Sequence, residues 1–474
     1  MLRFLWVPAV FWFMPDTVNN VSTPKVGKKV VITELRSLLQ LAAPLLGAQL
    51  LNSGTGVVDT MMAGHYHAND LAAVAIGSSL WLPLFLLIAG LMIAVTSMVA
   101  RFHGGNQPGA IVTTTQQGIW LALLMGVAAG VLLACSEPIL RWFDVSDEIM
   151  PIASGYLLAI AFAMPAVAIF SGLRGFCEGM SQTRPYLIAC LVAFLVNIPL
   201  NYVLIYGKFG LPELGGVGCG WATTASFWLQ VLLLVFFIRN PERFHGVDLF
   251  RHWLKPQLAE IRKIAVLGLP IALAVFAEVT IFSAIALLLA PLGATVVGGH
   301  QIALSVSLLF FMLPLSLSQA VTIRVGYFLG RKQQATANFV VATGLVTGMV
   351  LSLLTMLVIL LSREILVGFY TADAAVIAVA VPLFLWMALY QFPDHLQIMA
   401  NASLRAYQDT RVPLRIILFS YWGICLPLGF ILARTDWLGA PLAAQGFWLG
   451  LLVGLGLTAV LLLRRLYRIA RQPL

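Results

Sequence analysis

The chain has 474 residues, of which 60% are hydrophobic and only 10% are charged, and its mean hydropathy is +0.94. One soluble core could not bury so much apolar surface, so the composition excludes a soluble globular protein and favours a lipid bilayer. The net charge of +9 comes from basic residues spread between apolar segments, which argues against a nucleic-acid-binding protein. The five cysteines show neither CxxC spacing nor a histidine cluster, so we predict no disulfide framework and no zinc site.

The first residues do not form a recognisable span. Phe4–Met14 is strongly apolar, but it contains Pro8 and is shorter than the roughly 20 residues that a transmembrane helix needs. No small-residue cleavage site follows it, so the pattern does not favour a signal peptide. We expect residues 1–34 to be a cytoplasmic N-terminal segment, and two interpretations stay open: an interfacial segment or a start extended upstream.

Twelve apolar windows follow, each long enough for a transmembrane helix. The first six lie near residues 35–63, 71–100, 110–135, 150–173, 185–206 and 217–238. A hydrophilic stretch, 239–263, separates them from six more, near residues 264–290, 297–328, 336–361, 376–401, 413–432 and 440–463.

The basic residues orient these windows. With a cytoplasmic N-terminus, 24 of the 28 Lys and Arg residues fall on the cytoplasmic side and four on the outer side. Such a bias is a positive-inside signal. We therefore expect both termini and the 239–263 stretch in the cytoplasm, and the protein in a bacterial inner membrane.

The two halves of the chain match each other at a constant offset of 226 residues. Leu35–Pro44 lies over Ile261–Pro270, and the same offset pairs Thr96 with Thr322. Proline and threonine positions match as well as leucine and alanine, which makes chance similarity between apolar helices a poor explanation. Each repeat has an even number of spans, so both enter the membrane from the same side.

The sequence therefore predicts an all-α integral membrane protein with twelve transmembrane helices in two six-helix bundles, related by a pseudo-twofold axis along the membrane normal. Two bundles with a pathway between them are what alternating access requires, which favours a transporter. The expected parts are the segment 1–34, an N-terminal lobe 35–238, a cytoplasmic linker 239–263, a C-terminal lobe 264–463 and a basic cytoplasmic tail 464–474.

Three of the 19 acidic residues, Asp59, Glu278 and Asp394, fall inside apolar windows. A charged side chain at mid-bilayer costs about 2.5–3.5 kcal/mol on insertion scales, so such residues usually face a cavity or a partner. No Lys or Arg lies deep in the same windows, and Arg174 and Arg324 near the cytoplasmic ends are better interpreted as anchors. We therefore expect a mobile counter-charge: a proton, Na⁺ or a cationic substrate.

Each acid of the second half has an aromatic residue one helical turn away: Phe282 follows Glu278, and Tyr390 precedes Asp394. A carboxylate beside an aromatic face suits a weakly hydrated cation. Pro393 frees a backbone carbonyl, which supplies a neutral oxygen ligand or a hinge. Ligation by oxygen alone fits Na⁺ and excludes soft transition metals.

The first half differs from the second. Asn52 stands at the position that matches Glu278, and the acid of this half, Asp59, lies further along the same span. Asn197 and Asn201, one turn apart, form a polar stripe that needs partners in lipid surroundings. We interpret Asp59 as a residue that exchanges a proton and couples transport. An interfacial Asp59, and an asparagine pair that only links helices, are the alternatives.

Several longer motifs occur in a fixed order along the chain. They are Val57–Gly64, Leu211–Gly220, Gly268–Ala272 with Glu278–Phe282, Gly299–Leu304 and Ala320–Tyr327. Together they resemble the NorM branch of the multidrug and toxic compound extrusion (MATE) family, from about Leu35 to Arg468. Residues 1 to about 30 depart from that pattern.

The resemblance implies a cation-coupled drug antiporter of two six-helix lobes with a V-shaped cavity and no resident cofactor. It implies a cation site in the second lobe formed by Glu278, Asp394, Phe282 and Tyr390. Of these we predict Glu278, Asp394 and Tyr390 as the Na⁺ ligands. Phe282 and Tyr390 are also expected to line the substrate cavity, together with Gln301.

For the first lobe, the resemblance implies a proton or substrate site formed by Asp59, Asn197 and Asn201. The two asparagines are also expected to line the substrate cavity.

We expect export of amphipathic, often cationic, organic compounds in exchange for inward Na⁺ or H⁺, by a monomer without a nucleic-acid partner. A flippase for lipid-linked substrates is an alternative, but it would be expected to line its cavity with Arg or Lys to hold phosphates. A membrane-embedded lipid-modifying enzyme is another, but the chain contains neither HExxH nor GxSxG. We therefore predict that the protein is not an enzyme.

Overall fold

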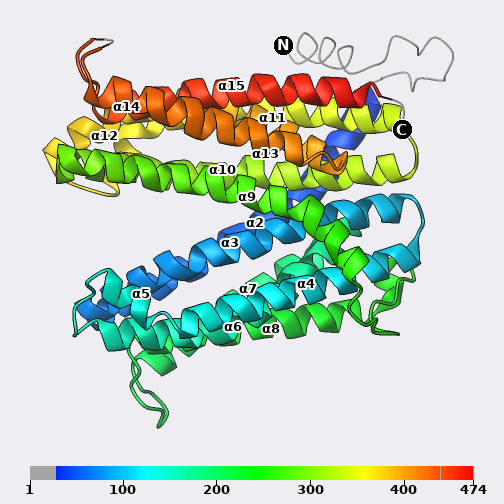
Figure 1. The fold of residues 1–474 in the computed structure, drawn as a ribbon, viewed down its shortest axis with the longest axis horizontal. Coiled ribbons are helices and arrows are strands. Elements are labelled where there is room, and N and C mark those ends of the chain that lie inside the picture. The colour runs from blue at the N-terminus through cyan, green and yellow to red at the C-terminus, as the bar shows by residue number, and fades with distance from the viewer. Residues whose placement is uncertain (1–27, 438, 473–474) are drawn as a thin grey trace. The chain divides into compact units, whose positions relative to one another are not determined.

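The computed structural model describes residues 28–437 and 439–472, and every regular element in these residues is helical. Twelve of the described helical segments are long and apolar enough to cross a membrane, which confirms the predicted number of spans (Figure 1). The apolar Phe4–Met14 segment lies outside the described residues.

The described residues form two compact units, one of residues 43–272 and one of residues 28–42 with 273–437 and 439–472. The chain passes from one unit to the other at two places, both inside a helix: within α2 (Lys28–Tyr66) and within α9 (Leu258–Leu289). In each helix a proline lies within two residues of this boundary, Pro44 in α2 and Pro270 in α9. Proline removes a helical hydrogen bond, so each repeat starts with a helix that is weakened where it passes from one unit to the other.

The unit of residues 43–272 is built around α6 (Met150–Gly179), which contacts α3, α4 and α8. Glycines let these helices approach closely: a Cβ built on Gly130 of α4 would lie 2.7 Å from the Ala161 carbonyl oxygen of α6. The other elements of this unit are α3 (Ala68–Gly104), α4 (Pro108–Ala134), α5 (Glu137–Trp142), α7 (Arg184–Ile205), α8 (Gly216–Ile238) and the short helix η1 (Pro241–Phe244).

The polar segment between α8 and α9 lies on the end of α4. Gln116 donates from Nε2 to the carbonyl oxygens of Leu249, at 2.7 Å, and His252, at 2.8 Å. Gln117 bonds in the same way to Lys255 and receives the backbone N–H of Gln257. These bonds give partners to backbone groups of a segment without regular structure, residues 249–257, which ends at the residue before α9.

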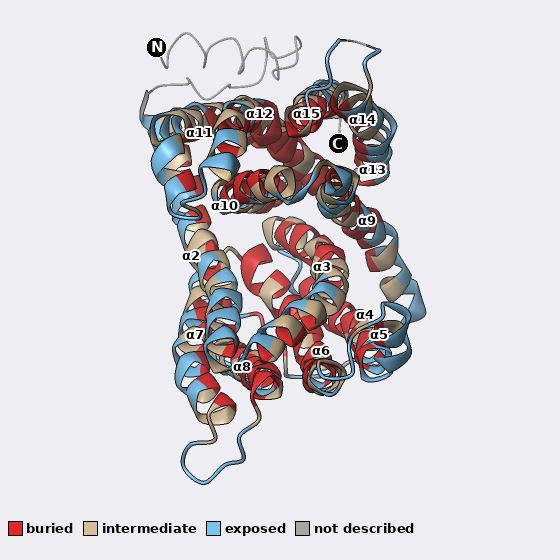
Figure 2. Cartoon of the chain, turned by 90° about the vertical axis from the view of Figure 1, so that its left-hand side faces the viewer, coloured by how far each residue is buried: buried red, intermediate tan, exposed pale blue. Residues whose placement is uncertain are grey.

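The unit containing residues 273–474 is organised around α12 (Ala374–Ala406), which contacts α10, α11 and α15. Its apolar core includes Phe384, Phe447 and Trp448, all fully buried. In both units the buried residues gather on helix faces turned toward neighbouring helices (Figure 2). The remaining elements are η2 (Ala290–Leu292), α10 (Ala294–Gly330), α11 (Gln334–Gly368), α13 (Arg411–Leu418), η3 (Phe419–Cys425), α14 (Leu426–Arg434) and α15 (Ala444–Ala470).

One span of this unit is interrupted. The eleventh candidate span, 411–434, consists of α13, the π-helical segment η3 and α14. A π-helical turn inserts extra backbone into a helix and is frequent at functional sites. Here it sets the direction of Ser420 and Tyr421, which are both buried.

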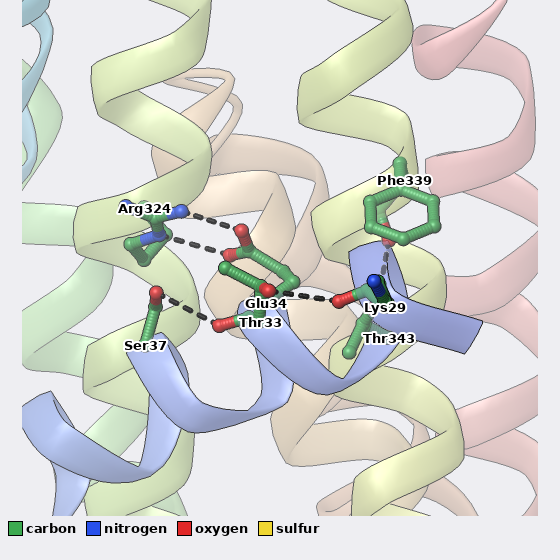
Figure 3. A network of polar contacts seen from close by, with 7 residues as sticks. All are labelled: Lys29, Thr33, Glu34, Ser37, Arg324, Phe339 and Thr343. Atoms are coloured by element: carbon green, nitrogen blue, oxygen red, sulfur yellow. Dashed lines mark hydrogen bonds and ion pairs between the residues drawn. The ribbon is translucent and has the colours of Figure 1, made fainter. Parts of the chain in front are cut away.

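The beginning of α2 is joined to α10 by a buried ion pair. Arg324 donates to both carboxylate oxygens of Glu34, with a distance of 2.9 Å from Nε to Oε1, as Figure 3 shows. Leu38 and Ala42 of α2 pack in the same apolar cluster as α10 and α11 residues. These contacts are the reason why the first residues of α2 belong to the unit that contains residues 273–474.

Candidate cation-binding sites

In the first repeat, both carboxylate oxygens of Asp59 accept hydrogen bonds from neighbouring side chains. Its Oδ1 accepts from Nδ2 of Asn201 at 2.6 Å, and its Oδ2 accepts from the Thr223 hydroxyl at 2.6 Å. Asn201 also donates to Oδ1 of Asn197 at 2.9 Å. All four side chains are buried. The helices α2, α7 and α8 thus bring together the acid and both asparagines of the predicted first-lobe site, and both oxygens of the acid have a donor.

In the second repeat, Asp394 lies beside a glutamine. Gln397 donates from Nε2 to Oδ1 of Asp394 and to the Tyr421 hydroxyl, both at 3.4 Å. Trp422 of η3 donates to the backbone carbonyl of Ala277, the residue before Glu278, at 3.3 Å. The elements α9, α12 and η3 therefore meet beside these two acids, at one polar cluster inside this unit.

Tyr390, four residues before Asp394 on α12, contacts α10 and α15. Its hydroxyl is hydrogen-bonded to Ser307 of α10, and its ring packs edge-to-face on Trp448 with a centroid distance of 5.6 Å. Phe282 is partly buried against the same apolar cluster. Gln301 is exposed, on α10.

No Lys or Arg lies deep in the windows of these acids, but a buried arginine lies just beyond one of them. The hydropathy window of the tenth span ends at residue 401, whereas α12 continues to Ala406 and buries Arg405 on the face of the helix that also carries Asp394. Arg324 and Arg174, which the sequence suggests as anchors, each form an ion pair. Arg324 pairs with Glu34, and Arg174 pairs with Glu178 at 2.6 Å.

The chemistry of the second-repeat site limits which ions it can bind. The described residues contain no group of three or more His, Cys, Asp and Glu side chains that could hold a metal ion. Glu278 Oε1 and Asp394 Oδ2 nevertheless lie buried without a hydrogen-bond partner among these residues. Carboxylate oxygens supported by neutral oxygens suit a hard monovalent cation or a proton, and do not suit a soft transition metal.

Four residues of these sites were not predicted as site residues from the sequence: Thr223, Gln397, Arg405 and Tyr421. Helical periodicity could have indicated two of them, because Gln397 and Arg405 follow Asp394 by three and eleven residues and so share its face of α12. No pattern marks Thr223 or Tyr421, since hydroxyl residues are common in transmembrane helices and the π-helical turn has no sequence signature.

Comparison with known proteins agrees with this architecture. The MatE family model matches the chain twice, over residues 44–203 and 270–431. The matches begin at Pro44 and Pro270, the prolines that the internal offset superposes, which supports the duplication. The chain is 45% identical over 457 residues to the multidrug resistance protein PmpM of Pseudomonas aeruginosa, covering 96% of each chain.

A second relative is the multidrug resistance protein NorM of Vibrio cholerae, 43% identical over 440 residues that cover 93% of this chain and 96% of the relative. The crystal structure of the eukaryotic MATE transporter AtDTX14 superposes with a TM-score of 0.82 at 21% identity, over 93% of this chain and 99% of that one. At this identity the superposition shows similarity of the fold alone.

The fold and the intramembrane acids define a multi-pass membrane transporter, not an enzyme. The chain belongs to the MatE family, and within it to the multidrug efflux transporters that include NorM.

Proposed function

We propose that the protein exports amphipathic, often cationic, organic compounds in exchange for inward Na⁺ or H⁺. The names of PmpM and NorM as multidrug resistance proteins support drug-like substrates. An acidic interior attracts a cationic substrate, and aromatic and aliphatic walls accept its apolar body.

One observation carries the coupling part of this proposal. In the second-repeat site, Glu278 Oε1 and Asp394 Oδ2 have no donor among the described residues, whereas both oxygens of Asp59 in the first repeat are hydrogen-bonded. Buried carboxylate oxygens without donors are costly unless a cation or proton binds them. We therefore assign the coupling cation to Glu278 and Asp394, and a proton or substrate site to Asp59 with Asn197 and Asn201.

The proposed location is a bacterial inner membrane with both termini in the cytoplasm. The excess of Lys and Arg in alternate loops supports this orientation. In this orientation, an inward gradient of Na⁺ or H⁺ across the membrane would drive the cation inward while the drug moves out.

The test is transport by the purified protein in vesicles. An inward Na⁺ gradient at fixed pH, or a pH gradient without Na⁺, should drive the movement of a fluorescent cationic dye. The double variant Glu278→Gln with Asp394→Asn should abolish gradient-driven movement. Glu137→Gln is the matched control, because Glu137 is an exposed acid paired with Arg141 on α5. Dye movement by the double variant at the parent's rate would refute the proposed function.

A further inference from the structure

The second-repeat site contains a third buried oxygen without a hydrogen-bond donor in the described part of the chain. Gln397 Oε1, like Glu278 Oε1 and Asp394 Oδ2, is buried and accepts no hydrogen bond from the described residues. The Gln397 residue is 1% exposed. Leaving a buried acceptor unpaired costs on the order of 1–3 kcal/mol, and more for a charged one. Three such acceptors in one cluster are therefore expected to face a common ligand that is a cation or a strong donor.

Three helical elements hold these oxygens together. The Trp422 indole of η3 donates to the backbone carbonyl of Ala277, the residue before Glu278, at 3.3 Å. The next residue back in η3, Tyr421, accepts from Gln397, which also donates to Asp394. The π-helical segment thus bonds to α9 at the residue before Glu278 and to Gln397 of α12, whose amide nitrogen also donates to Asp394.

Gln397 supplies a neutral oxygen beside these acids in addition to the predicted Tyr390. The Tyr390 hydroxyl is hydrogen-bonded to Ser307, and its ring packs on Trp448. An amide oxygen is a good ligand for a hard monovalent cation, and it accepts a hydrogen bond equally well.

The charges of the cluster set how much positive charge it can take. Glu278 and Asp394 carry two negative charges when both are ionised, and the buried Arg405 guanidinium carries one positive charge. Arg405 lies on the face of α12 that also carries Asp394 and Gln397, and its side chain leans toward the N-terminus of the helix, that is, toward them. One unit of negative charge remains, which a single monovalent cation neutralises.

We propose that Gln397 is a ligand of the coupling cation, and that Glu278, Asp394 and the amide oxygen of Gln397 form a three-oxygen site for one Na⁺ or one H⁺. Na⁺ is coordinated by all three oxygens, whereas a proton binds one carboxylate, and the resulting O–H donates to another of the three oxygens. This inference rests on the proposed cation-coupled function and adds the ligand set and the charge of the ion.

The experiment measures cation binding to the purified, full-length protein in an Asp59→Asn background, which removes the first-repeat acid. One arm uses radioactive Na⁺ at fixed pH. The other measures proton uptake on acidification without Na⁺ as the difference from the Glu278→Gln, Asp394→Asn variant, because the other carboxyl and histidine side chains also take up protons. Whichever arm gives binding by the parent identifies the ion. Gln397→Leu should weaken that binding by at least about 10–100-fold, because it removes one of three ligands and the loss of a group that only orients a ligand already costs that much.

Gln391→Leu is the matched control, since Gln391 is a fully buried glutamine of the same helix whose amide oxygen is also unpaired among the described residues. Gln391 lies six residues before Gln397 and therefore on a different face of α12, so this variant should bind as the parent does. If Gln397→Leu binds like the parent while Glu278→Gln does not, the role of Gln397 is refuted and the proposed function stands. If Glu278→Gln also binds like the parent, the proposed function itself is refuted.

Two charge variants test the same inference without removing a polar group. Gln397→Glu adds a third carboxylate, so Ca²⁺ should begin to compete with the monovalent cation. Arg405→Gln should raise the number of bound cations per chain from one to two, and Arg405→Lys should keep it at one. An unchanged number in Arg405→Gln, or no competition by Ca²⁺ in Gln397→Glu, would overturn the charge balance on which the three-oxygen site depends.

Discussion

The ion pair between Glu34 and Arg324 should be a main source of stability for the unit that contains it. The side chains are 9% and 22% exposed, and the guanidinium bonds to both carboxylate oxygens. Removing one partner of a buried pair costs about 3–5 kcal/mol because the other charge is left uncompensated. Arg324 keeps some contact with water, so we expect Glu34→Gln to cost about 3 kcal/mol, the lower end of that range.

This loss corresponds to about two orders of magnitude in the folding equilibrium. Unfolding of the purified protein by increasing SDS in mixed micelles measures it. Glu137→Gln provides the comparison, because Glu137 and Arg141 form an ion pair with 54% and 72% exposed side chains, and such pairs contribute about 0–1 kcal/mol. Equal destabilisation by the two variants would refute the reasoning from burial. A Glu34→Arg, Arg324→Glu exchange should recover part of the loss.

Two further predictions concern close packing and hydrogen bonding. Gly450→Ala should destabilise the protein by about 1–3 kcal/mol, because its Cβ would lie 2.8 Å from the Cys425 carbonyl oxygen. Gly456→Ala on the same helix meets nothing within 4 Å and should be neutral or stabilising by about 0.5–1 kcal/mol. Thr223→Val should cost about 1.5–3 kcal/mol of stability through the lost bond to Asp59, whereas Thr223→Ser should keep most of it. SDS unfolding checks all of these variants, and equal behaviour of the two glycine variants, or of the two threonine variants, would contradict the packing or the hydrogen bond.

The repeat and the number of spans could be predicted from the sequence because both depend on local composition. Apolar windows reflect the thickness of the bilayer, and Pro44 and Pro270 stand at matching places in both halves. The sequence could also single out Asp59, Glu278 and Asp394, because a charge inside an apolar window is conspicuous.

The partners of those acids could not be predicted in the same way. Thr223 reaches Asp59 from a different helix, and no local pattern reports that approach. Arg405 was missed because a hydropathy window ends where polar residues begin, although the helix and its burial continue. Tyr421 depends on a π-helical turn, whose extra residue changes the face that a side chain occupies.

The most direct test of cation coupling through the second-repeat acids is dye movement in vesicles under an imposed gradient. The parent should move the dye only when an inward Na⁺ gradient at fixed pH, or an inward H⁺ gradient without Na⁺, is present. Replacing Na⁺ by K⁺ at fixed pH distinguishes the two ions. Glu278→Gln with Asp394→Asn should move no dye under either gradient, and gradient-driven movement by this variant at the parent's rate would contradict the assignment.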